Sequence, residues 1–123
     1  MQTTKRTGPT NIVLRKTIRI LKKYANKYNA PIWRAVAEKL ERPRRRRIVV
    51  NVSKINRYTK PGDTVVVPGK VLGAGNIDHP VSVAAIAFSY TAVQKIKAAG
   101  GKVMHILDLL ESNPRGSNVK III

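Results

Sequence analysis

The segment RPRRRR at positions 42–47 places five arginines directly before the apolar segment IVVNV. It lies near the boundary between two regions of very different charge. Residues 1–60 hold 18 of the 24 basic residues and two acidic residues, a net charge of +16, whereas residues 61–123 hold six basic and four acidic residues, a net charge of +2. Positive charge of this density disfavours a compact chain unless a polyanion neutralises it. The asymmetry therefore predicts a region that binds nucleic acid, joined to an ordinary globular region.

The basic region has the apolar periodicity of two helices. A helix capped by Thr10 or Asn11 is predicted to run to about Tyr28, and Pro31 fits the first turn of a second helix that stops at Pro43. The polar face of the first helix is expected to be cationic, with no acidic residue to pair with it. The predicted apolar stripes consist of Leu14, Ile18, Leu21, Ala25 and Tyr28 in the first helix, and of Ile32, Val36 and Leu40, with Trp33 beside them, in the second.

The rest of the chain alternates short β-branched segments with helical ones. Pro68-Gly69-Lys70 is predicted to form a turn, and Ser53 to cap a short helix. Gly100-Gly101 is predicted to end a helix in the left-handed conformation that favours glycine. Strands are predicted at 48–52, 64–67, 81–87, 102–106 and 119–123, and helices at 55–58, 90–98 and 108–112.

This alternation predicts an α/β fold: a basic helical N-terminal segment followed by a layered globular domain. A chain of 123 residues is long enough for one such domain with its own core. The expected parts of this single domain are a basic arm at 1–9, a basic helical segment at 10–42, the arginine run at 43–47 and the α/β core at 48–123.

The sequence contains no motif for a cofactor, a metal or catalysis. Cysteine is absent, which excludes disulfides and thiolate sites, and His79 and His105 have no partners at metal-ligand spacing. The glycine-rich segment at 68–76 lacks the lysine of a P-loop and the third glycine of a dinucleotide site, so turns are expected there. Asp78 precedes His79, but adjacency alone supplies neither a nucleophile nor an orienting group. We expect no cofactor, no small-molecule substrate and no enzymatic activity.

Membrane association is not expected either. The N-terminus, MQTTKRTGPTN, lacks the apolar part of a secretory signal, and the most apolar segment, VSVAAIAF, is too short to cross a bilayer. A membrane-surface role for the first helix is an alternative, but its apolar stripe is narrow and its aromatic residues are tyrosines. The chain is expected to be soluble and cytoplasmic.

The arginine run is interpreted as a phosphate-binding segment, because arginine bonds two phosphate oxygens with its planar fork. A solvated loop and a nuclear-localisation segment are alternatives. Tyr58 is the one aromatic residue considered for contact with a base, although a core or rim position is favoured for it. The residues predicted to bind RNA are Lys5, Arg6, Arg15, Lys16, Arg19, Lys22, Lys23, Arg42, Arg44, Arg45, Arg46, Arg47, Lys54, Arg57, Lys60, Lys70 and Arg115.

Four blocks span nearly the whole chain: TNIVLRKTIRILKK, RPRRRRIVVNVSKINR, TVVVPGKVLGAG and AAGGKVMHILDLLESNPRG. In this order and spacing they resemble the archaeal and eukaryotic large-subunit ribosomal protein family called L-eighteen-e, in its short archaeal form. The resemblance implies a structural constituent of the large ribosomal subunit that binds large-subunit rRNA and neighbouring ribosomal proteins, with an irregular β-β-α globular part and no catalysis. A transiently bound assembly or modifying factor and a DNA-compacting protein are the alternatives.

Overall fold

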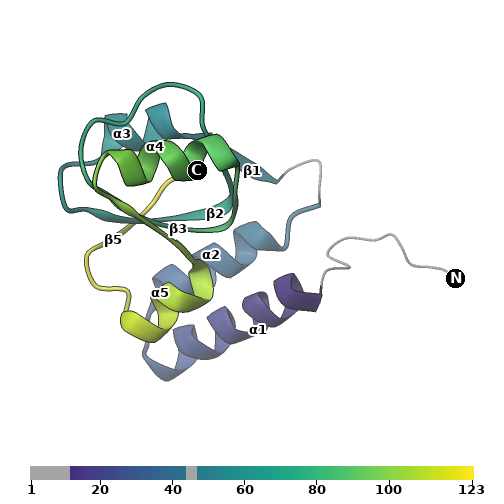
Figure 1. The fold of residues 1–123 in the computed structure, drawn as a ribbon. Coiled ribbons are helices and arrows are strands. Elements are labelled where there is room, and N and C mark those ends of the chain that lie inside the picture. Colours follow the sequence, from purple (N-terminus) through teal and green to yellow (C-terminus); the bar gives the residue numbers. More distant parts are fainter. Residues whose placement is uncertain (1–11, 44–46) are drawn as a thin grey trace, which may run out of the picture.

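The computed structural model describes residues 12–43 and 47–123 of the chain, which alternate helices and strands (Figure 1). The α/β class predicted from the sequence is confirmed. In chain order the elements are α1 (Ile12–Lys27), α2 (Pro31–Leu40), β1 (Ile48–Asn51), α3 (Val52–Tyr58), β2 (Thr64–Leu72), β3 (Ser82–Phe88), α4 (Tyr90–Ala98), β4 (Lys102–His105), α5 (Ile106–Ser112) and β5 (Val119–Ile121).

The strands form one sheet in the order β1-β2-β3-β4, with β5 also paired to β2. Each of these pairs is parallel. The long strand β2 is paired with β5 over residues 64–66 and with β1 over residues 69–72, so the two short strands follow one another along its length. The connection between α2 and β1, which contains the arginine run, therefore leads directly into the sheet.

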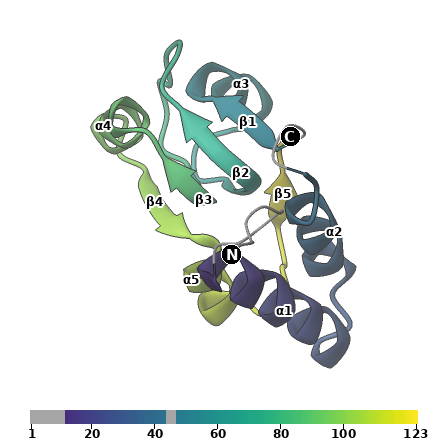
Figure 2. The ribbon, with the colours of Figure 1, turned by 90° about the vertical axis from the view of Figure 1, so that its right-hand side faces the viewer.

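Helices cover both faces of the sheet, which gives three layers (Figures 1 and 2). Successive residues of a strand point to opposite faces. Val66 accordingly packs with the buried side chains of α1, α2 and α5, whereas its neighbours Val65 and Val67 pack with those of α3 and α4. We call the layer of α1, α2 and α5 the helical layer, because the basic half of the chain forms most of it.

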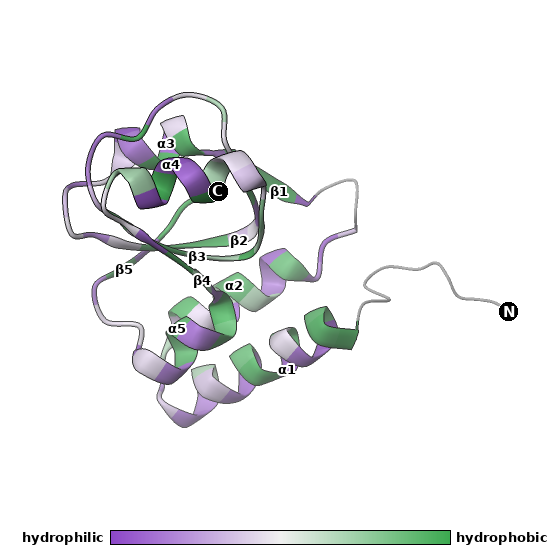
Figure 3. Ribbon diagram, viewed as in Figure 1, coloured by the Kyte–Doolittle hydropathy of each residue, from purple (hydrophilic) through white to green (hydrophobic). Residues whose placement is uncertain are grey.

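Leu14, Ile18, Leu21 and Ala25 of the apolar stripe predicted for the first helix are buried as expected. Figure 3 shows the apolar residues of α1 in green. Tyr28, the last residue of the stripe, lies just after α1 and is only half-buried. Thr17 is the one buried polar residue of the helix, and its hydroxyl donates to the carbonyl oxygen of Val13 at 2.8 Å. In α2, Trp33 is fully buried and its Nε1 donates to the carbonyl oxygen of Pro114 at 2.8 Å, which ties α2 to the segment after α5.

The turn predicted at Pro68-Gly69-Lys70 is wrong, because β2 continues through these residues. Pairing with β3 shifts register between Val67 and Lys70, so Pro68, which has no N–H to donate, lies at an irregularity rather than in a regular ladder. Gly69 is needed for a different reason. A Cβ atom at this position would lie 2.1 Å from the carbonyl oxygen of Ile48, so only glycine allows β1 to approach β2 this closely.

Other boundaries also differ from the predictions: β3 is shifted by one residue, and β4 and β5 end earlier than predicted. The short helix α3 begins at Val52, with Asn51 rather than Ser53 as its N-cap, so the first strand ends before Val52. The helix α5 begins at Ile106 rather than at 108, because the Nδ1 of His105 accepts from the backbone N–H of Leu107 and starts the helix early. The left-handed glycine predicted after α4 is confirmed at Gly100, whose φ is +89°.

Candidate nucleic-acid interface

The outer face of α1 carries a row of exposed cations. Leu14, Ile18 and Leu21 pack the opposite face with buried residues of α2, α5 and the sheet, which holds the helix in place. Since residues three and four apart in a helix lie on the same face, the basic side chains stand one above another along the surface. The predicted RNA-binding residues exposed or half-exposed on this face are Arg15, Lys16, Arg19, Lys22 and Lys23.

A groove of about 490 Å³ lies between α1 and the end of α2. Arg15, Arg19 and Lys22 line it from α1, and Glu41 lines it from the turn after α2. The Nζ of Lys22 lies 2.8 Å from Oε2 of Glu41, so the expectation that this face has no acid to pair with it is wrong. Among the residues that the structure describes, no acidic side chain pairs with Arg15 or Arg19, and these two remain available to an anion.

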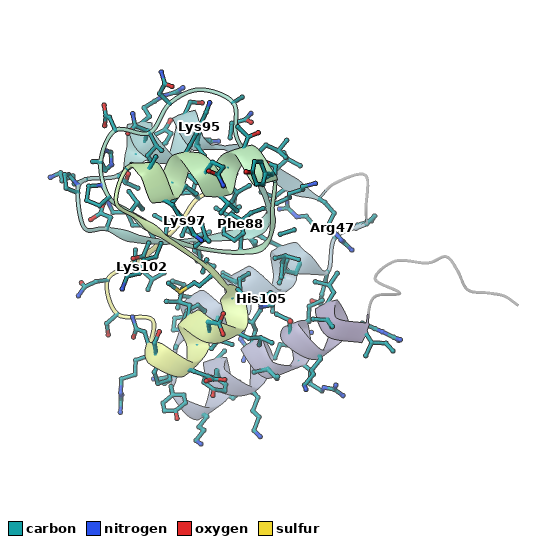
Figure 4. The ribbon with its side chains drawn as sticks, viewed as in Figure 1. Arg47, Phe88, Lys95, Lys97, Lys102 and His105 are labelled. Atoms are coloured by element: carbon teal, nitrogen blue, oxygen red, sulfur yellow. The ribbon has the colours of Figure 1, made fainter. Side chains whose placement is uncertain are left out.

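The arginine run is described only at its two ends. Arg42 is exposed, and the Nε of Arg47 (Figure 4) donates to the main-chain oxygen of Arg42 at 3.2 Å. Arg47 and Lys70, far apart in sequence, line one cavity of about 260 Å³, because Ile48 pairs with Gly69. The remaining predicted residues of the arm and the run, Lys5, Arg6, Arg44, Arg45 and Arg46, lie outside the described residues.

The other predicted residues are divided between the two sides of the sheet. Lys54, Arg57 and Lys60 belong to α3 or the loop after it, on the side opposite the helical layer. Lys54 is half-buried and its Nζ donates to the main-chain oxygen of Ile123 at 2.5 Å, so a structural contact already uses it. Arg115, in contrast, lies in the helical layer, with its Cζ 6.0 Å from the ring centroid of Tyr28.

Two basic residues that the sequence did not single out also belong to the cationic surface of the helical layer. Lys27 is exposed in the last turn of α1, and its Nζ lies 5.4 Å from the ring centroid of Tyr28. Arg34 is exposed on α2 and its guanidinium donates to the side-chain oxygen of Asn26. Helical spacing from Lys23 could have found Lys27, whereas the position of Arg34 depends on how α1 and α2 pack.

The histidines and glycines have structural roles in the described part of the chain. His79 contacts the carboxylate of Asp78 through Nδ1 at 2.9 Å and the hydroxyl of Thr59 through Nε2 at 2.7 Å, which joins two loops. Residues 73–76 form no regular strand or helix, and Gly75 has a φ of +86°. Within residues 12–43 and 47–123, no group of three His, Cys, Asp or Glu side chains could hold a metal ion.

Asp63 is the carboxyl whose environment most clearly favours ionisation. The backbone N–H of Lys60 donates to its Oδ2 at 2.8 Å, and the Nζ of Lys120 lies 2.9 Å from the same oxygen. The hydrogen bond from Lys60 and then that from Lys120 lower the pKa of Asp63. This acid therefore neutralises Lys120 instead of the cations of α1.

In the described part of the chain, no helix is both long and apolar enough to span a membrane.

Comparison with known proteins confirms the family resemblance over nearly the full length of the chain. A family model of ribosomal proteins, whose description includes 50S-L15 and 50S-L18e, matches residues 30–104. The chain is 57% identical over 121 residues to "Large ribosomal subunit protein eL18" of Methanopyrus kandleri, covering 94% of this chain and 95% of that protein. It is 51% identical over 116 residues to the protein of the same name from Sulfurisphaera tokodaii, covering 94% and 95% of the two chains.

These matches account for both halves of the molecule. The family model covers α2 and most of the α/β core, and the relatives extend the similarity to both ends. Both relatives are archaeal proteins of nearly the same length as this chain, as the short form predicted. The expectation of a ribosomal structural component rather than an enzyme is confirmed. The chain therefore belongs to the family of ribosomal proteins that includes 50S-L15 and 50S-L18e.

Proposed function

We propose that this protein binds and organises large-subunit rRNA through the outer face of the helical layer. The observation that carries the proposal is the row of exposed cations on α1, opposed among the described residues by one paired acid, Glu41. Uncompensated cations on a protein surface are the usual footprint of a nucleic-acid interface. Such contacts set the position of the RNA backbone and do not read its sequence.

Rigidity supports the proposal as much as charge does. Arg15 and Arg19 stand one helical turn apart, and the intervening Ile18 is buried in the core. Their backbone is therefore ordered before RNA arrives, and only side-chain freedom is lost on binding. The groove beside them has a volume of about 490 Å³ and is lined by both arginines. We assign these two arginines the strongest phosphate contacts of the helix.

The ends of the arginine run extend this surface towards the sheet. Arg47 and Lys70 line a cavity that Leu14, near the start of α1, also lines, so these two cations face one region beside α1. Arg115 and Lys27 extend it at the other end of α1, around Tyr28. A surface of this extent can hold more than one segment of rRNA. Neighbouring ribosomal proteins are the second class of partner that we propose, as for any component of a packed ribonucleoprotein.

The test compares the salt dependence of RNA affinity in two double variants. Arg15→Ala with Arg19→Ala removes two charges from the groove, and Lys97→Ala with Lys102→Ala removes two exposed charges from α4 and β4 (Figure 4). We expect the first variant to flatten the slope of log affinity against log salt by about 0.7–0.9 for each lost phosphate contact. The second variant should retain the wild-type slope. Equal slopes in all three proteins would contradict the proposal.

A further inference from the structure

A second groove lies on the other side of the molecule from the cationic face of α1. It has a volume of about 540 Å³ and is lined by Lys54 and Tyr58 of α3 and by residues 120–123. The two elements come together because β5 pairs with the start of β2, which places the residues after it beside α3 (Figure 2). The groove is therefore built by segments more than 60 residues apart.

The walls of this groove expose apolar surface that the fold does not use. Tyr58 is 55% exposed and Ile123 is 47% exposed, although both are large apolar side chains. The helix that carries Tyr58 is well anchored, because Val52 and Ile55 are fully buried in the core between α3, α4 and the sheet. The tyrosine ring is thus presented to solvent from a fixed backbone, and a ligand does not have to order it.

Basic residues flank Tyr58 in the chain, and one of them lies against its ring. The Cζ of Arg57 lies 5.8 Å from the ring centroid of Tyr58, and Lys60 is exposed two residues further on. Lys54 is already bonded to the main-chain oxygen of Ile123, and Lys120 to Asp63. Among the described residues, no acidic side chain forms a salt bridge with Arg57 or with the exposed Lys60, although the charge of Lys60 also acts on Asp63. Lys54 and Lys120 hold the groove in shape.

We propose that this groove binds an unpaired RNA base, stacked on the ring of Tyr58, with the adjoining phosphate held by Arg57 and Lys60. The proposal rests on the RNA-binding function proposed above and adds a contact of another kind. An aromatic ring beside a guanidinium group is the combination that recognises exposed bases, since every base has a π-face. An apolar peptide would suit Ile123 equally well, but the cations around Tyr58 favour a polyanion.

The base must be unpaired, because stacking in a duplex covers both faces of each paired base. The α1 surface and this groove are therefore expected to bind different parts of a folded RNA. The sugar-phosphate backbone of the RNA would bind the α1 surface, and an extruded nucleotide or a single strand would bind the groove. The sheet between them keeps the two sites at a fixed separation, so one molecule can position two segments of RNA relative to each other (Figure 1).

The test uses the full chain and two probes: a single-stranded oligouridylate of about 12 nucleotides, which is within the usual site size of single-strand binders, and an RNA duplex of the same length. Tyr58→Ala should weaken binding of the single strand about tenfold, the usual effect of losing one stacked base. It should leave duplex affinity and the salt slope unchanged. Tyr58→Phe, which keeps the ring, should bind the single strand as the wild type does. Replacing one uridine by 4-thiouridine should, on irradiation, attach the single strand to the peptide that contains Tyr58.

Three results would overturn the proposal. Equal single-strand affinity of wild type and Tyr58→Ala, with normal duplex binding, would exclude the groove but leave the cationic face of α1 as the RNA site. Attachment of the 4-thiouridine strand only to peptides that lack Tyr58 would place the single strand elsewhere on the protein. Failure of the wild type to bind either probe would remove both proposals together. Thermal unfolding of each variant confirms that it is folded, as expected for an exposed residue.

Discussion

The ammonium group of Lys95 lies 2.7 Å from the carbonyl oxygen of Gly73 and 2.6 Å from that of Gly75. This lysine of α4 therefore closes the glycine-rich loop after β2. Asn51 holds the same loop from the other side, where its Oδ1 accepts from the backbone N–H of Ala74 at 3.2 Å. Although the net charge of the chain is +18, the charge of Lys95 therefore has a structural role within the α/β core.

Replacing Lys95 by methionine should lower the free energy of unfolding without changing the affinity for RNA. The variant leaves two carbonyl groups without their charged donor, and hydrogen bonds to charged groups contribute about 1.5–3 kcal/mol each in favourable cases. Because Lys95 is only half-buried, we expect a decrease of about 1–3 kcal/mol in the free energy of unfolding, measured with urea. Lys97→Met, at an exposed position of the same helix, should change stability by less than about 0.5 kcal/mol. Equal effects of the two substitutions would show that the loop does not depend on Lys95.

Gly69→Ala should destabilise the protein strongly, because Gly69 lies where β1 and β2 approach closely. Its Cβ would lie 2.1 Å from the carbonyl oxygen of Ile48, a backbone atom that cannot move without shifting β1. We expect the free energy of unfolding to fall by about 2–3 kcal/mol, as in other overpacked sites. The comparison is Gly62→Ala, where a Cβ would meet no atom within 4 Å but φ is +88°. That variant should lose about 1 kcal/mol through backbone strain alone. A larger loss at Gly62 than at Gly69 would contradict this ranking.

Trp33→Phe should destabilise the helical layer. The substitution removes the Nε1 donor of a fully buried side chain, leaving the carbonyl of Pro114 without that donor, and it also creates a small cavity. Both effects lower the free energy of unfolding, together by about 2–4 kcal/mol. Circular dichroism is the suitable measurement, because Trp33 is the only tryptophan of the chain and the variant has no tryptophan fluorescence. A change below about 0.5 kcal/mol would mean that α2 does not depend on this contact.

Acid should destabilise the wild type more than the Asp63→Asn variant. The pKa of Asp63 is lowered in the folded protein by the Lys60 hydrogen bond and by Lys120, from an ordinary value of 3.8. A carboxyl with a lowered folded pKa stabilises the protein above its ordinary pKa, and this contribution is lost as pH falls through the folded pKa. Melting temperatures measured between pH 7 and about pH 2 should therefore converge for the two proteins below pH 3.8. Parallel curves over the whole range would exclude Asp63 as the source.

The local sequence pattern correctly predicted the elements whose ends and buried faces depend on residues close in sequence. The stripe of α1 is buried as its spacing indicated, and α4 has the predicted bounds, because Ser89 caps it by accepting from the N–H of Ala92 and Gly100 ends it. The continuous β2 was missed, because Pro68-Gly69 favours a turn in isolation. Pairing with β1 and β3 on either side overrides that preference.

The candidate interface was predictable in charge but not in arrangement. Helical periodicity was enough to place Arg15 and Arg19 on one outer face. The pairing of Lys22 with Glu41 joins residues 19 apart, and the bond from Lys54 to Ile123 joins residues 69 apart. Such pairs depend on how whole elements pack, and no local spacing contains that information. The exposure of Tyr58 also depends on how whole elements pack, whereas the sequence favoured a core or rim position for this residue.

The order of synthesis gives the contact between Trp33 and Pro114 a consequence for assembly. The basic half of the chain is translated first, yet α2 is held by a residue made 81 positions later, and β5 pairs with β2 only after that. A nascent chain therefore carries the basic residues of α1 before the layer that fixes their spacing is complete. The helical layer therefore reaches its final packing only once the chain has been synthesised beyond Pro114.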